Sequence, residues 1–286
     1  MSAESKPLVL KDLLSRDFSL PICPEVFVRL TAVITDESKT VSDLSQVLLS
    51  DPALTAQVLR ISNSAYFGVS RQIHSIEEAV FRIGFKGVWT VAAVIKAQEA
   101  CRGAAGEWTD FNENLWQHST KTAAFAYALS KRLNPLYVDV YFTAGLLHDI
   151  GKLILNQLAP SYASICSNGL SGGYDLVWHE MELFGTHHAK LGAELLTHWD
   201  LPEVIVELVS FHHEPPAKDD SLRLSRRILT VANEMAHAAE LSQTISTIDT
   251  SVMERAGLLG EVGLNIEACA SVGADAQQRL AMMNLV

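Results

Sequence analysis

Apolar residues recur at helical spacing along most of the chain, and strand-like alternation is scarce. This pattern constrains the chain to an all-α fold. Stop signals separate the helical stretches: Asp51-Pro52 supplies an N-cap followed by proline at the first helical position, and Ser75 to Glu78 has capping-box spacing before Gly84. We therefore expect short helices from Pro52 and over 75–83, followed by a more apolar helix over about 88–100.

The second part of the chain is predicted to be helical as well. Helices are expected over 115–133, 138–147, 175–183, 187–198, 202–212 and 222–240. Two short helices are expected within 241–286, where Gly257, Gly260, Gly263 and Gly273 supply stops. The segment 101–106 has two glycines among small residues, which makes it the best candidate for a linker between two helical regions. The predicted units are an N-terminal helical lobe (1–107), a second helical lobe (108–240) and a C-terminal helical extension (241–286).

Composition narrows the class of partner and the compartment. The chain has 286 residues, 48% of them apolar, and a net charge of −11. Acidic residues outnumber basic ones 21 to 11 in 108–286 but only 12 to 11 in 1–107, so nucleic acid is an unfavoured partner for the second part. The four widely spaced cysteines suggest neither a zinc knuckle nor a disulfide framework. No apolar run has membrane-spanning length, so we expect no membrane association and a cytoplasmic protein.

The run from Tyr141 to Lys152 carries the strongest chemical signal. It is apolar until His148 and Asp149 close it, with Gly151 and Lys152 directly behind. Imidazole and carboxylate groups are ligands that divalent transition metals accept. The competing interpretation is a helix that stops at Gly151 with two polar residues at its rim.

Other histidines favour a shared site. His118, His148, His188, His212 and His213 fall on helix faces or at predicted helix ends, and a helical bundle can gather such ligands onto one or two ions. Each of them alone would be more typical of a capped or surface residue. We expect a divalent metal here (iron, manganese, nickel or zinc), and we expect His74, His179 and His198 to play no part.

The chain resembles the HDOD domain, a bacterial relative of the HD metal-dependent phosphohydrolases, from about Leu20 to Pro215. The matching segments are 20–21, 49–54, 58–68, 73–79, 142–152, 184–185, 188–192 and 201–202. The resemblance implies an all-α fold in which an N-terminal helical lobe packs on an HD-like helical lobe. It also implies a role in bacterial signalling and regulation.

The related HD-GYP phosphodiesterases, which hydrolyse cyclic di-GMP, imply roles for individual residues. His118 matches their first histidine, and His148 and Asp149 match the His-Asp pair. Lys152 matches the lysine that approaches substrate phosphate. The remaining metal-ligand positions are matched by His188, His212 and His213.

Three departures argue against cyclic di-GMP hydrolysis. Asn233 stands where that family has a late aspartate, and an amide neither offsets metal charge nor serves as a base. Asn114 stands where three-metal members have a glutamate, and Glu113 would point about 100° away. No Gly-Tyr-Pro follows His213. His237, one turn beyond Asn233, is a candidate replacement for the aspartate.

Three hypotheses follow. The preferred one is a signalling or regulatory module built on a degenerate HD phosphohydrolase fold, which retains a metal and contacts a kinase or response regulator. The alternative is a metal-dependent phosphohydrolase, a phosphodiesterase acting on a nucleotide or cyclic dinucleotide, with Asp149 and Lys152 as its catalytic residues. The third is a nucleic-acid or nucleotide sensor in the N-terminal lobe. It rests on Arg60, Arg71, Arg82 and Lys86, two of which flank a helix-turn-helix-like turn at Gly84.

Overall fold

The computed structural model describes residues 25–36, 38–64, 67, 72–102, 109–159, 161–167, 173–214, 222–242 and 257–283. Within these residues the regular elements are all helices, which confirms the all-α prediction. The predicted linker falls mostly in 103–108, outside the described residues. Leu20, Pro21, Arg71 and most of the loop over 167–173 lie outside them too. The unit boundaries near 107 and 240 remain predictions.

The N-terminal lobe is a group of helices around α6. It contains α2 (Glu25–Thr35), α3 (Val41–Leu49), α4 (Pro52–Ser62), α5 (Ile76–Ile83) and α6 (Phe85–Arg102). The predicted caps are present: the Asp51 side chain accepts a hydrogen bond from the Leu54 amide, Ser75 accepts one from Glu78, and Gly84 has φ +80°. The apolar helix α6 is longer than expected and contacts the other four.

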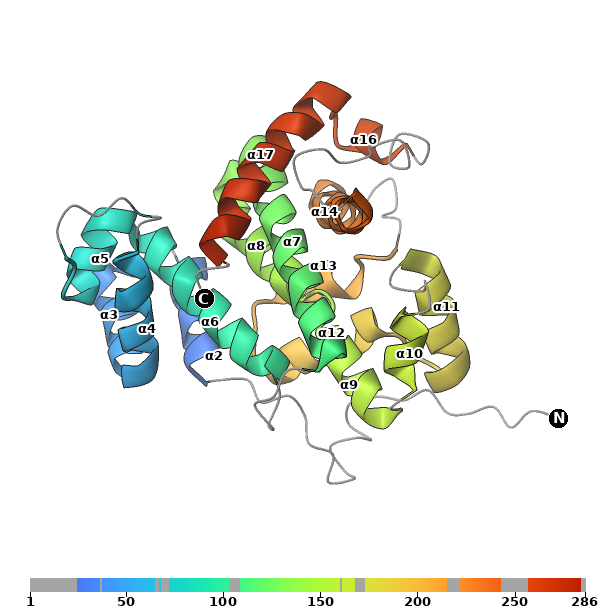
Figure 1. Ribbon diagram of the computed structural model, residues 1–286, viewed down its shortest axis with the longest axis horizontal. Helices are drawn as coiled ribbons and strands as arrows, with labels where there is room; N and C mark the ends of the chain where they lie inside the picture. Colours follow the sequence, from blue (N-terminus) through green and yellow to red (C-terminus); the bar gives the residue numbers. More distant parts are fainter. Residues whose placement is uncertain are drawn as a thin grey trace.

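The HD-like lobe surrounds the long helix α7 (Asp110–Leu133), which runs through the middle of the molecule (Figure 1). It continues with η2 (Pro135–Tyr137), α8 (Val138–Leu147), α9 (Gly151–Leu158), α10 (Tyr162–Ser167), α11 (Gly173–Phe184), α12 (His188–His198), α13 (Glu203–Ser210) and α14 (Arg223–Ser242). Helices α8 and α14 pack directly on α7, and α12 packs on α9 and α13.

The C-terminal part differs from its prediction. After α16 (Leu258–Glu261), the chain forms one long helix, α17 (Ile266–Met283), which lies along α7 and reaches α6 (Figure 1). Gly273 lies inside α17, so the expectation that this glycine stops a helix was wrong. A glycine inside a helix costs about 1 kcal/mol of stability relative to alanine. The burial of its neighbours Val272 and Ala276 outweighs that cost.

The two lobes and α17 meet in one contact region. Trp89 of α6 makes an edge-to-face contact with Phe142 of α8, with ring centroids 6.4 Å apart. The Arg279 guanidinium of α17 lies 4.1 Å from the Tyr127 ring centroid and 4.9 Å from that of Phe142, and it donates a hydrogen bond to Thr90 Oγ1. The N-terminal lobe therefore packs on the HD-like lobe, and the C-terminal helix bridges both. Among the described helices, none has the length and apolar character needed to cross a membrane.

Candidate metal centre

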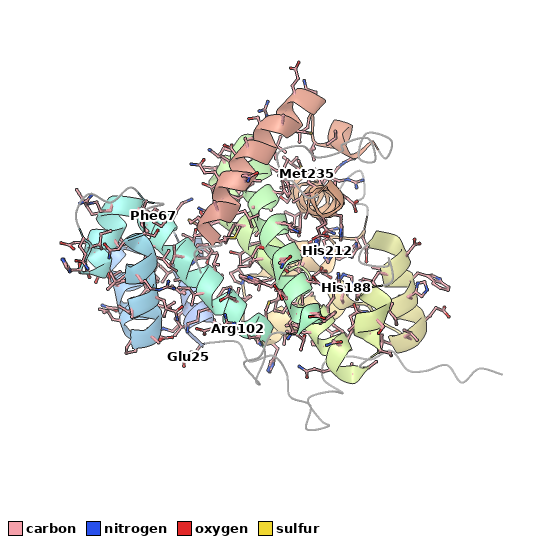
Figure 2. All side chains as sticks on the ribbon, in the orientation of Figure 1. Glu25, Phe67, Arg102, His188, His212 and Met235 are labelled. Atoms are coloured by element: carbon pink, nitrogen blue, oxygen red, sulfur yellow. The ribbon has the colours of Figure 1, made fainter. Side chains whose placement is uncertain are left out.

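Asp149 lies at the middle of the histidine cluster. Its Oδ1 is 3.2 Å from His188 Nε2 and 3.8 Å from His212 Nε2. Its Oδ2 is 3.3 Å from His148 Nε2 and 3.8 Å from His118 Nε2. Figure 2 shows His188 and His212 close together in the HD-like lobe, and their ring centroids are 5.4 Å apart. Each oxygen of one buried carboxylate therefore faces its own pair of imidazoles.

Two glycines allow the helices that carry these residues to approach closely. A Cβ on Gly145 of α8 would lie 2.8 Å from the Ala123 Cα of α7. A Cβ on Gly151 would lie only 2.0 Å from the His188 carbonyl oxygen. Gly151 therefore begins α9 and lets it meet α12. The competing sequence interpretation, in which a helix stops at Gly151, is wrong: α8 already ends at Leu147, and Gly151 starts the next helix.

Backbone and side-chain acceptors orient the imidazoles. His148 Nδ1 donates to the Gly145 carbonyl at 2.8 Å, and His212 Nδ1 donates to the Val209 carbonyl at 2.7 Å. His188 Nδ1 contacts the Glu180 carboxylate at 2.7 Å. Because the outer nitrogen of each ring carries the proton, Nε2 of His148 and His212 presents its lone pair to the interior.

Glu180 is a candidate site residue that the sequence pattern did not indicate. It is 1% exposed, and its carboxylate accepts hydrogen bonds from the His188 backbone amide and from the Tyr162 hydroxyl. Burial alone would raise the pKa of Glu180, but the charge and hydrogen bonds of His188, together with the hydrogen bond from Tyr162, lower it. Its only sequence signal is a carboxylate placed on the helix before His188, and this signal is weak without the tertiary contact.

The residues present fit a divalent transition metal. His148 Nε2, His212 Nε2 and Asp149 Oδ1 are buried and have no hydrogen-bond partner among the described residues. Such atoms are unfavourable unless something else satisfies them. Ligand atoms of Asp149, His188, His212 and His213 lie within 4.8 Å of one another, as do those of His118, His148 and Asp149. Asp149 belongs to both groups, so the set could hold one ion or two.

Most protonation states suit metal binding. Burial, reinforced by neighbouring histidines, holds the pKa of His212 and of His213 well below the usual value. Burial would raise the pKa of Asp149, but His148 and Lys152 outweigh it and hold that pKa well below its usual value. His188 differs: burial lowers its pKa, yet Glu180 and Asp149 together raise it. A metal at His188 would therefore displace a proton.

Lys152 lies beside the cluster and is paired within it. Its Nζ donates to Asp149 Oδ2 at 2.7 Å, and its side chain is buried. Burial acts to lower the pKa of Lys152, but the charge of Asp149 and its hydrogen bond to Lys152, with smaller contributions from other acidic neighbours, together raise it. Lys152 therefore keeps its positive charge and partly neutralises Asp149.

Asn233 faces the cluster, at the position inferred from its order in the chain. It is 3% exposed, and its Oδ1 lies 2.8 Å from His118 Nε2. His237, one turn further along α14, stacks on His118 with ring centroids 4.3 Å apart. His237 therefore lies on the outer side of His118 and does not take the place of the missing carboxylate inside the cluster.

A cavity of about 390 Å³ opens beside His118, Asp149 and Lys152. Its wall also includes Asn114 and Lys121. Glu113 is not among the residues of this wall, as its predicted angular position requires, and its Oε1 accepts a hydrogen bond from Gln117 at 3.4 Å. A small anionic molecule could reach the cluster from this side.

The histidines expected to play no part lie outside the metal-ligand groups of the described residues. His179 is bonded through Nδ1 to the Asp175 carbonyl, His74 donates its backbone amide to Glu78, and His198 is exposed.

Comparison with known proteins places this site in a family context. A 201-residue segment is 27% identical to an uncharacterized protein of Treponema pallidum, covering 69% of this chain and 38% of that protein. The chain spans about two-fifths of the length of the curated relatives it matches. A candidate phosphohydrolase of Shewanella amazonensis is 26% identical, with 98% of both chains covered and a TM-score of 0.72.

A second crystal structure shows the same fold. It is an HDOD domain protein of unknown function from Geobacter sulfurreducens, 23% identical, with 96% of both chains covered and a TM-score of 0.75. The HDOD domain model itself matches residues 20–215. This match covers most of the described helices and ends just after the paired histidines, and it shows that the chain belongs to the HDOD domain family.

Proposed function

We propose that this protein is a regulatory module whose HD-like lobe holds one or two divalent transition-metal ions and acts through contacts with signalling proteins. The ligands would be His148, Asp149, His188, His212 and His213. The observation that carries the proposal is a ligand set that converges on Asp149 while an amide, Asn233, faces His118 from the side where an active relative would offer a carboxylate.

The metal would act mainly as a structural element. Binding to the folded state alone stabilises it by about 2.7 kcal/mol at a hundredfold excess over Kd. It would also satisfy the buried lone pairs of His148 and His212, which otherwise lack partners among the described residues. A rigid lobe of this kind could present a constant surface to a kinase or a response regulator. We also propose a cytoplasmic location, because no apolar run in the sequence has membrane-spanning length.

A metal-dependent phosphohydrolase is the second candidate, and the cavity beside Asp149 favours it. A metal in this site would supply Lewis-acid activation of water. Lys152 would orient a phosphate group of a nucleotide or cyclic dinucleotide, and Lys121 would add positive charge at the rim. Asn233 supplies no negative charge or base, which is why this function ranks second.

Elemental analysis tests the shared part of both proposals. Protein purified without a histidine tag or chelator should contain one or two equivalents of iron, manganese, nickel or zinc. His148→Ala should contain less, and His198→Ala, a change on an exposed histidine, should match the wild type. Equal metal content in wild type and His148→Ala would contradict the proposed metal centre around Asp149.

Activity and binding assays separate the two functions. A phosphohydrolase should cleave a model phosphodiester such as bis(p-nitrophenyl) phosphate in the presence of manganese or iron, and His148→Ala should abolish that cleavage. A regulatory module should show no turnover and should bind a defined kinase or response regulator encoded in the same genome. Metal-dependent turnover that His148→Ala removes would overturn the preferred function.

A further inference from the structure

A second group of ligand types lies on the outer side of His118, away from Asp149. Helix α14 presents Asn233, His237 and Glu240 at intervals of four and three residues, so they share one helix face. This face meets His118 of α7. The Glu240 carboxylate is 3.0 Å from His118 Nδ1 through Oε1 and 3.5 Å from His237 Nδ1 through Oε2.

Each ring nitrogen of His118 lies next to a polar side chain of α14. Its Nε2 faces Asn233 Oδ1 at 2.8 Å, with the Thr122 hydroxyl 3.5 Å away, and its Nδ1 faces Glu240 Oε1 at 3.0 Å. A neutral imidazole carries one N–H. With that proton on Nε2, a lone pair on Nδ1 points at a carboxylate, and a cation between them would remove the repulsion.

His237 can complete such a site. Its Nδ1 lies 3.5 Å from Glu240 Oε2, and ligand atoms of His118, His237 and Glu240 lie within 4.8 Å of one another. Its Nε2 is buried and has no hydrogen-bond partner among the described residues. Glu240 is partly open, with 31% of its side chain exposed, and Lys121 Nζ lies 3.6 Å from Oε1. Lys121 would balance Glu240 when no ion is bound.

We propose that His118 Nδ1, His237 and Glu240 form a second metal site, at the rim of the cavity and distinct from the centre around Asp149. Two imidazoles and one carboxylate are the donor set of zinc sites that keep an open fourth position. All three residues line the cavity, so the open position faces it, and Lys121 and Lys152 lie on the same wall. The fourth ligand would be water or an anionic oxygen such as phosphate.

This site changes the role of His118. Sequence matching assigned it to the inner centre, but its Nε2 is held by Asn233 and lies 3.8 Å from Asp149 Oδ2. Asn233 therefore occupies Nε2 of His118 and leaves its Nδ1 for the rim site. The inference goes beyond the proposed function, since none of its other ligands belongs to the inner centre.

Zinc titration of the full chain, stripped with chelator and followed by calorimetry, tests the inference. Wild type should bind about one equivalent more than Glu240→Gln or His237→Gln. Glu234→Gln, a matched change on the same helix, should bind as wild type does, and His213→Gln should keep the rim ion. Crystals soaked in zinc should show anomalous density between His118, His237 and Glu240.

The outcomes separate this inference from the proposed function. Loss of zinc in His213→Gln but not in Glu240→Gln would support the inner centre and overturn the rim site. Loss in Glu240→Gln but not in His213→Gln would support the rim site and contradict the inner centre. Unchanged stoichiometry and affinity in Glu240→Gln would mean that the Asn233 amide turns its NH₂ toward His118 and that no ion is needed.

Discussion

The two lobes bury polar groups for different reasons. In the N-terminal lobe the buried hydroxyls of Thr31 and Thr90 donate to carbonyls one turn earlier in their own helices, and Lys96 pairs with Asp51 and Glu99. The N-terminal lobe also has buried hydroxyls without hydrogen-bond partners among the described residues, among them those of Ser62 and Ser64. In the HD-like lobe, imidazoles and carboxylates converge from α7, α8, α9, α11, α12, α13 and α14 or their adjoining turns. Several of their atoms have no hydrogen-bond partner among the described residues. In this cluster the atoms without partners are imidazole and carboxylate atoms, which a bound cation would satisfy.

The largest expected effect comes from Gly151→Ala. The added Cβ would lie 2.0 Å from the His188 carbonyl oxygen and 2.7 Å from the Gly192 amide nitrogen, and these backbone atoms cannot move without separating α9 from α12. We expect a loss of about 4 kcal/mol or more in the free energy of unfolding, measured by denaturant titration.

Gly87→Ala on α6 is the matched control in the other lobe. There the nearest atom to the new Cβ is Ile83 Cγ1 at 3.4 Å, an ordinary contact. This change should raise stability by about 0.5–1 kcal/mol through helix propensity. Similar effects at the two glycines would show that the close approach at Gly151 has no special cost.

Leu44→Ala tests the apolar lobe. Leu44 of α3 is fully buried, and such a truncation costs about 3 kcal/mol, including the cavity it leaves. The loss should be the same in metal-loaded and chelator-treated protein, because the N-terminal lobe contributes no ligand. Leu49→Ala, at a side chain that is 60% exposed, should cost less than about 0.5 kcal/mol. A strong dependence of the Leu44→Ala effect on metal would show that the lobes do not differ as described.

Glu180→Gln tests the orientation of His188. The amide keeps the size of the side chain but loses the charge that holds the His188 ring, so metal affinity should fall by about 10- to 100-fold. Competition with a chromophoric chelator would measure the change. Glu182→Gln, at an exposed position on the same helix, should leave the affinity unaltered. If both variants bound metal equally well, Glu180 would have no positioning role.

The smallest effect is a pH dependence in the N-terminal lobe. The hydrogen bond from Lys96 lowers the pKa of Asp51, so this carboxylate stabilises the fold above its unfolded pKa of 3.8. That contribution is lost as the pH falls through the lower pKa of the folded state. Asp51→Asn keeps a good N-cap for α4 but removes the charge, so its stability should vary less with pH below about pH 4. A profile identical to wild type would contradict the pairing with Lys96.

Local sequence signals predicted much of the fold. The cap at Asp51 gave the start of α4, Ser75 and Gly84 gave both limits of α5, and the predicted range of α8 matches the structure. Gly273 gave a wrong stop, because the burial of α17 against α7 is a tertiary effect that no local rule includes. The start of α9 at Gly151 was missed for the same reason: only the position of α12 explains it.

The site was predictable to a lesser degree. His148 and Asp149 adjoin in sequence, so their proximity was certain, and the other predicted ligands do lie around them. Glu180 was invisible because its role depends on α11 passing behind His188. The order of residues along the chain indicated that Asn233 faces the cluster, but its hydrogen bond to His118 depends on how α14 packs on α7.

Arg279 has a consequence for how this protein can be divided. Its guanidinium joins α17 to Thr90 in one lobe and to Tyr127 and Phe142 in the other, although the family match ends at residue 215. A fragment cut at that match would expose the faces of α7 that α14 and α17 cover. A fragment that keeps these faces of α7 covered, whether it is moved between genes or fused to another protein, therefore has to extend to Met283.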